Sequence, residues 1–360
     1  MAAGKTKGQD MSDWAFFRRV LIVGAVLVLG LLVWRLADVV LLLFGAALIG
    51  LLLSSAADAI GRHTGLPRSA SLAIVTLLLV GFFAVIIVLF GTQIGAQLAD
   101  LWQRLPGAVD NLEQRLNLGD ISNWIREKAQ SNTGNILFQI TSWASTMFNA
   151  VGDILLLVVA ACFFAADPDL YRNGALKLFP PEQRRRFEDT LDFSAAALRQ
   201  WMTGQLIAVL LVGTITTIGL WYIGIPSPLA LGLIAGILEF VPFIGPLLSA
   251  IPALLLALTL GWSEIGWTVG LFVLIQVLES NLMTPLIQKR MVSLPPVLTL
   301  FAIVCFGVLF GPLGVLFATP LAVFLFVAVN QLYVRQLLHQ PTEVPGEKAV
   351  REERREQAEA

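Results

Sequence analysis

Charged side chains are rare in the apolar C-terminal third of this 360-residue chain. Between Trp201 and Val334 there are five: Glu239, Glu264, Glu279, Lys289 and Arg290. A carboxyl group held in an apolar segment without a partner can exchange a proton or bind a cation. Glu239 has no basic neighbour in the sequence, so it is a candidate for this chemistry, although exposure at an interface or a partner elsewhere would also explain it.

Glu279 ends an apolar stretch together with other polar side chains: Gln276, Asn281 and Thr284. Polar groups at membrane depth are candidates for substrate or ion pathways. The alternative for Glu279 is an ion pair with Lys289 or Arg290. Two isolated amides, Gln205 and Asn330, are instead expected to form hydrogen bonds between helices.

Two apolar segments are too long to be single membrane helices, which need about 20 residues. The first covers residues 229–260 and the second covers residues 297–334. Proline and glycine break both of them, at Pro242, Gly245 and Pro246 in the first, and at Gly311, Pro312 and Pro320 in the second. Proline frees a carbonyl group, and in lipid that group must bond to protein, water or substrate.

The two broken segments resemble each other, since each carries a Gly-Pro-Leu sequence followed by another proline. A pair of broken helices at corresponding positions indicates a transport site, although proline and glycine are also common in ordinary membrane helices. Each segment either crosses the membrane once or forms a re-entrant hairpin. The hairpin alternative keeps Lys289 and Arg290 on the cytoplasmic side, which agrees with the positive-inside trend.

The composition defines the fold class. Hydrophobic residues make up 57% of the chain and charged residues 14%, far from the values of soluble domains. We predict an all-α polytopic membrane protein, with about six full transmembrane helices plus two Gly/Pro-broken segments as possible inverted re-entrant hairpins, or with eight spans if each segment crosses once.

Several functional classes are excluded by the same counts. A net charge of −1 argues against a nucleic-acid partner bound through bulk charge. Two cysteines and two histidines give no recognisable metal site, and we predict no cofactor. Serine residues in the apolar segments lack a histidine partner, so no enzyme is expected.

Basic residues set the predicted orientation, with both termini in the cytoplasm. The predicted organisation is a cytoplasmic N-terminal segment (1–19), three transmembrane helices (20–92), an extracytoplasmic amphipathic helical insert (93–150), a fourth transmembrane helix (151–166), a cytoplasmic basic amphipathic loop (167–203), a C-terminal transport core (204–335) and a disordered cytoplasmic tail (336–360).

Two amphipathic segments suggest partners. In the insert, leucines recur at helical spacing from Leu98 to Leu116. This pattern is consistent with packing within the insert or on the bilayer, and also with a contact between subunits of a homo-oligomer. In the cytoplasmic loop, Arg184, Arg185 and Arg186 begin an amphipathic helix, and we predict that they contact the lipid bilayer.

Motifs in the last third resemble those of the AI-2E (autoinducer-2 exporter) transporter family: Gly224-Ile225-Pro226, residues 240–246 (FVPFIGP), residues 279–285 (ESNLMTP) and residues 311–321 (GPLGVLFATPL). The resemblance covers about residues 20–335 and implies a permease of the bacterial inner membrane. Family members are described as exporters of the signalling furanone autoinducer-2 in quorum sensing or as Na+(Li+)/H+ antiporters. It therefore implies export of a small polar organic solute coupled to the proton gradient. The alternatives are Na+(Li+)/H+ antiport and a non-transport role as a membrane scaffold or regulator.

Overall fold

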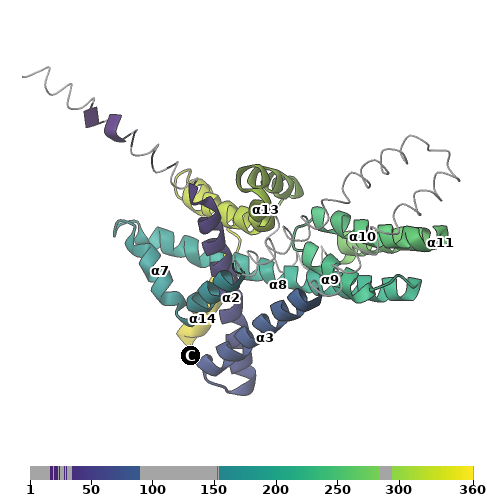
Figure 1. The fold of residues 1–360 in the computed structure, drawn as a ribbon. Coiled ribbons are helices and arrows are strands. Elements are labelled where there is room, and N and C mark those ends of the chain that lie inside the picture. Colours follow the sequence, from purple (N-terminus) through teal and green to yellow (C-terminus); the bar gives the residue numbers. More distant parts are fainter. Residues whose placement is uncertain are drawn as a thin grey trace, which may run out of the picture.

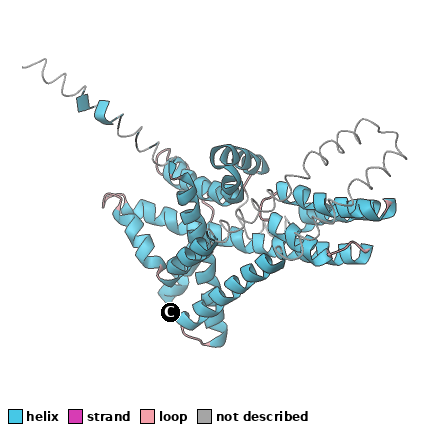
Figure 2. Cartoon of the chain, viewed as in Figure 1, coloured by secondary structure: helices cyan, strands magenta, loops and turns pink. Residues whose placement is uncertain are grey.

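A computed structural model describes residues 35–89, 154–283 and 294–359, together with a few isolated positions before Arg35 and Gly152. The described residues form helices and contain no strand (Figure 2). Four of these helices are long and apolar enough to cross a membrane, or five if one bent helix pair counts as a span. This confirms the predicted all-α polytopic membrane fold. The predicted insert (93–150) lies outside the described residues, as does most of residues 1–34.

The N-terminal part is a helical hairpin of α2 (Ala37–Thr64) and α3 (Arg68–Leu89) (Figure 1). A helix over Ile154–Ala166 packs on it. This contact is tight, because a Cβ atom on Gly50 of α2 would lie 2.9 Å from the carbonyl oxygen of Ala161. Arg68 joins the same elements by donating to Ser54 Oγ and to the carbonyl of Ala165.

Two helices occupy most of residues 167–203, where the sequence suggested a basic loop. The chain bends by 87° after Ala166 and enters α7 (Pro168–Lys177). Asp167 caps α7 by accepting a hydrogen bond from the amide of Leu170, and Pro168 suits the first helical position. The next helix, α8 (Arg184–Ile223), runs for 40 residues, or about 60 Å, and joins the predicted cytoplasmic loop (167–203) to the predicted transport core (204–335) without a break.

The first broken segment is a helical hairpin. Its arms are α9 (Pro228–Leu238) and α10 (Ile244–Leu260). Leu231 near the start of α9 lies in one core cluster with Leu256 and Ala257 near the end of α10, so the arms are antiparallel. Helix α11 (Trp262–Leu278) follows and packs against both α10 and α8 (Figure 1).

The second broken segment, α13 (Pro296–Ala328), bends sharply and continues into the π-helix η3 (Val329–Arg335). The bend is at Gly311, whose φ of 63° and ψ of −148° are open to glycine and strained for other residues. Beyond it the chain turns back, so that Gly314 lies against the carbonyl of Phe306 and Gly307 lies against Val315. The second segment therefore also reverses at its Gly-Pro sequence.

The C-terminal residues correct the prediction of a disordered tail over 336–360. Residues 347–359 form α14 (Glu347–Glu359), which packs on α8. Val344 and Val350 are buried in the cluster that contains Phe193 and Ala197 of α8. The sequence predicted disorder because the tail is rich in charge. In the structure, two buried valines and several ion pairs hold the tail against α8.

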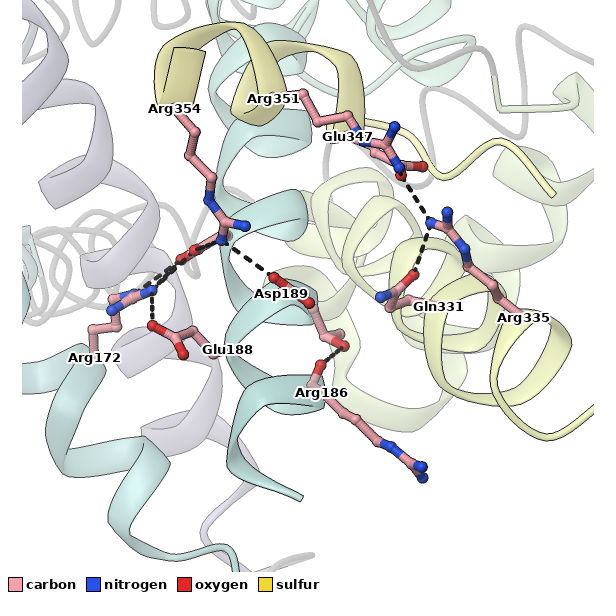
Figure 3. Close-up of polar contacts among 11 residues, drawn as sticks. Arg172, Arg186, Glu188, Asp189, Gln331, Arg335, Glu347, Arg351 and Arg354 are labelled. Atoms are coloured by element: carbon pink, nitrogen blue, oxygen red, sulfur yellow. Dashed lines mark hydrogen bonds and ion pairs between the residues drawn. The ribbon is translucent and has the colours of Figure 1, made fainter. Parts of the chain in front are cut away.

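Ion pairs connect this C-terminal helix to α8 and η3, and α7 joins the same network through α8 (Figure 3). Arg354 donates to Asp189 and Asp192 of α8, at 3.2 and 3.0 Å, and Arg172 of α7 reaches the same Asp192 at 2.9 Å. Glu347 accepts from Arg335 of η3 at 2.9 Å and also from Arg351. The end of the second broken segment is therefore tied to α14, and α14 is tied to α8.

Candidate functional site

The site lies at the tip of the α9–α10 hairpin. Glu239 follows the last residue of α9, and its amide still bonds to the carbonyl of Ala235. The chain then reverses over residues 239–243, where Phe243 adopts a positive φ of 68°. The reversal brings Gly245 against the carbonyl of Leu238, where a Cβ atom would collide with the backbone. Gly245 is thus required for the turn that presents Glu239.

The structure brings together the two carboxyl groups that the sequence singled out. Glu239 is only 2% exposed, and its side chain forms a hydrogen bond with that of Glu279. Two carboxyl groups can share a hydrogen bond only when one of them carries a proton, and two adjacent charges would repel strongly in an apolar interior. The other oxygen, Glu239 Oε2, is buried and has no hydrogen-bond partner among the described residues. The pair is therefore suited to hold a proton or a cation.

Glu279 begins a π-helix, η2 (Glu279–Met283), which continues α11. Such a π-helical turn breaks the regular hydrogen-bond pattern and occurs often at functional sites. Gln276 donates to Glu279 Oε2 at 3.3 Å, and Asn281 donates to the carbonyl of Val277 at 3.0 Å. Gln276 and Asn281 are exposed and Glu279 is partly exposed, so the pair joins one accessible carboxyl group to one buried carboxyl group.

Helix α8 supplies two contacts to the hairpin tip. The side-chain amide of Gln205 donates to the backbone carbonyl of Glu239 at 2.6 Å, and Trp201 packs edge-on against Phe240 with ring centroids 5.6 Å apart. The interhelical hydrogen bond predicted for Gln205 is confirmed. Its partner, the carbonyl of Glu239, was not predicted from the sequence. The corresponding prediction for Asn330 is wrong, since its amide bonds to Phe326 in its own turn.

The second broken segment faces the same core from another side. Phe310, just before Gly311, and Phe240 of the first hairpin both pack against the core cluster that contains Trp201 and Phe317. Pro312 is exposed next to the bend, and Pro320 is buried further along α13. In the first hairpin the residue with positive φ is Phe243, whereas in the second it is Gly311 itself. The two Gly-Pro sequences thus play different local roles. Pro242 lies within the first tip, and Pro246 lies in the first turn of α10.

Other predicted residues lie away from the pair or outside the described residues. Of these, the residues outside the described part are Thr284, Lys289 and Arg290. The suggested ion pair of Glu279 with Lys289 or Arg290 therefore stays a prediction. Arg184, Arg185 and Arg186 lie at the N-terminus of α8, about 27 Å along the helix axis from residue 204, where the predicted transport core begins. Their contact with the bilayer also stays a prediction.

Comparison with known proteins identifies the family. The sequence profile described as AI-2E family transporter matches residues 21–334. One similar protein, named "Putative transport protein YueF", from Bacillus subtilis (strain 168), is 27% identical over 277 residues, which are 71% of this chain and 74% of that protein. The AI-2 transport protein TqsA of Escherichia coli (strain K12) is 22% identical over 259 residues, or 68% of this chain and 73% of that protein. Because the profile covers most of the chain, the chain belongs to the AI-2E family of transporters.

Proposed function

We propose that this protein is a secondary transporter of the bacterial inner membrane that exports a small polar organic solute and couples its movement to protons through Glu239 and Glu279. The observation that carries the proposal is the hydrogen-bonded carboxyl pair at the hairpin tip, one member buried and the other partly exposed. Such a pair can take up a proton on one side and release it on the other as the surroundings change. The printed name of TqsA supports an autoinducer-2-like solute.

The length of the hairpin supports a position of its tip deep in the bilayer. Helix α9 has 11 residues and is about 16 Å long, roughly half of the 30 Å hydrocarbon layer. A hairpin that enters beside the end of α8 and returns to the same side would hold Glu239 near the midplane. Transport sites of secondary transporters lie at this depth, between broken helices. In this proposal the α9–α10 hairpin is re-entrant, and both chain termini are cytoplasmic.

A second candidate function is Na+(Li+)/H+ antiport. Side chains of the pair and of the residues near Glu279 in the sequence carry oxygen acceptors: Glu239, Glu279, Gln276, Ser280 and Asn281. Hard cations prefer oxygen ligands, so a cation and a proton would compete for the same two carboxyl groups. In this candidate the ion is itself the transported substrate.

Flux measurements in everted membrane vesicles with an imposed pH gradient separate these candidates. We expect labelled autoinducer-2 to accumulate in the vesicles when the wild-type protein is present and to dissipate part of the gradient. Addition of Na+ or Li+ would dissipate it instead if the protein is an antiporter. Glu239→Gln and Glu279→Gln should each abolish the response, because an amide cannot exchange a proton.

Glu264→Gln is the matched control, since Glu264 lies at the other end of α11, about 22 Å from Glu279 along the axis. It should leave flux unchanged. If well-expressed Glu239→Gln protein transports as fast as wild type, the carboxyl pair is not the coupling site. If neither solute nor cation moves the gradient, a scaffold or regulatory role replaces transport.

A further inference from the structure

Two side chains of α8 lie one helical turn apart and meet consecutive residues of the hairpin tip. Gln205 holds the backbone of Glu239, and Trp201 packs on the ring of Phe240. Residues four apart on a helix project from the same face. This part of α8 is thus a two-point attachment for the tip, which we call the α8 post (Trp201 and Gln205).

The hydrogen bond from Gln205 to the hairpin tip is short. Its amide nitrogen lies 2.6 Å from the carbonyl oxygen of Glu239, the last carbonyl before the chain reverses. Carbonyl groups at the end of a helix have lost their intrahelical partners and need a donor. At membrane depth no water is at hand to replace that donor. The Gln205 amide therefore fixes where α9 ends and where the Glu239 side chain starts.

The aromatic contact fixes the other side of the tip. Trp201 is 6% exposed and belongs to the core cluster that also contains Met202 and Phe317. Its edge-on contact with Phe240 holds the residue that follows Glu239, because aromatic pairs in this geometry stabilise a defined orientation. With its own carbonyl group bonded to Gln205 and the following residue held by Trp201, the backbone of Glu239 has little freedom to turn its carboxyl group away from Glu279.

We propose that Gln205 and Trp201 are positioning residues of the carboxyl site, which set the contact between Glu239 and Glu279 without touching the transported species themselves. This inference rests on the proposed function only in taking that pair as the coupling site. Removing the Gln205 donor should let the tip shift and should uncouple the two carboxyl groups, even though both remain in the protein.

Chemical labelling of Glu239 measures this coupling without any flux. A hydrophobic carbodiimide reacts with protonated carboxyl groups in membranes and leaves a stable adduct, which mass spectrometry locates on the peptide. The labelling rate of Glu239 in the reconstituted full-length protein would be compared with and without Glu279→Gln. Contacting residues in a shared network commonly show interaction energies equivalent to about tenfold. We therefore expect Glu279→Gln to change the rate about tenfold when Gln205 is present.

In the Gln205→Met background the same Glu279→Gln change should alter the rate less than twofold, since methionine matches glutamine in length but cannot donate. Thr203→Val is the matched control on α8. The Thr203 side chain is exposed and its hydroxyl donates to the carbonyl of Arg199 in its own helix, so the tenfold coupling should persist. Trp201→Leu should reduce the coupling, and Trp201→Phe, which keeps an aromatic edge, should restore most of it.

An undiminished effect of Glu279→Gln in the Gln205→Met background would overturn the positioning role. So would a wild-type labelling rate that does not depend on Glu279. If the coupling behaves as expected but vesicles show no proton-linked flux, the proposed function is wrong while the role of the α8 post stands.

Discussion

Helices α8 and α9 cross closely, so adding a single methyl group at the crossing should destabilise the protein. Three glycines meet there: Gly213 of α8 and Gly232 and Gly236 of α9. A Cβ atom on Gly236 would lie 2.8 Å from the carbonyl oxygen of Val209, where an ordinary contact needs at least 3.4 Å. The obstacle is backbone, which cannot rotate aside, so Gly236→Ala must push α9 away from α8 by about 0.6 Å. Overpacking of this kind costs about 1–3 kcal/mol.

Gly270→Ala in α11 is the control, because no atom lies within 4 Å of the added Cβ. Both changes gain the helix propensity of alanine, worth up to about 1 kcal/mol, so the difference between them isolates the clash. With roughly 2 °C per kcal/mol for a chain of this size, Gly236→Ala should unfold about 2–6 °C below Gly270→Ala. Tryptophan fluorescence of detergent-solubilised protein during heating measures this. Equal midpoints would refute the close crossing of the two helices.

Further predictions concern the C-terminal helix. Arg354→Gln removes the pairs to Asp189 and Asp192. Since partly exposed pairs contribute about 0.5–1 kcal/mol, a glutamate-specific protease should cleave α14 about two to five times faster, whereas Lys348→Gln, in an exposed pair, should have no effect. Burial raises the pKa of Glu347, but hydrogen bonds and charges of Arg335 and Arg351 lower it more, to below its ordinary value of 4.5. This stabilisation is therefore complete above the unfolded-state value and is lost as the pH falls through the folded-state pKa. Protease resistance of α14 should be flat from pH 8 to about pH 5 and fall at lower pH. In Glu347→Gln protein the fall should be smaller, and a fall as steep as in wild type would exclude Glu347 as its cause.

The sequence predicted the helical membrane fold and the two breaks because hydrophobic length and Gly-Pro placement are local signals. It also singled out Glu239 and Glu279 from the scarcity of charge around them. That they meet was not predictable, since they are 40 residues apart and their contact depends on how the hairpin folds back between them. Gln205 was recognised only as an interhelical donor, because an amide in an apolar span does not reveal which carbonyl it will meet.

The largest difference concerns the charged segments. The sequence predicted an amphipathic helix from Arg184, which α8 confirms, but assigned it to the bilayer surface, and it predicted a free tail over residues 336–360; both segments are rich in charge of both signs. In the structure these charges pair with one another across the two segments, at Arg354 with Asp189 and Asp192 and at Arg199 with Glu353. Composition counts charges but cannot say which of them are partners. The few apolar anchors that decide the docking, Val344 and Val350, are too sparse to form a recognisable pattern.

Because α8 is unbroken, it mechanically connects the ion-pair network at its N-terminal part to the carboxyl pair at the tip of the α9–α10 hairpin. Asp192, where Arg172 and Arg354 converge, lies 13 residues before Gln205, or about 20 Å along one rigid rod. A tilt of about 5° around Asp192 would carry Gln205 through about 2 Å, enough to break a hydrogen bond of 2.6 Å. A small rotation of α8 at its ion-paired N-terminal part would thus become a larger displacement at the carboxyl pair, with no change in any residue between them.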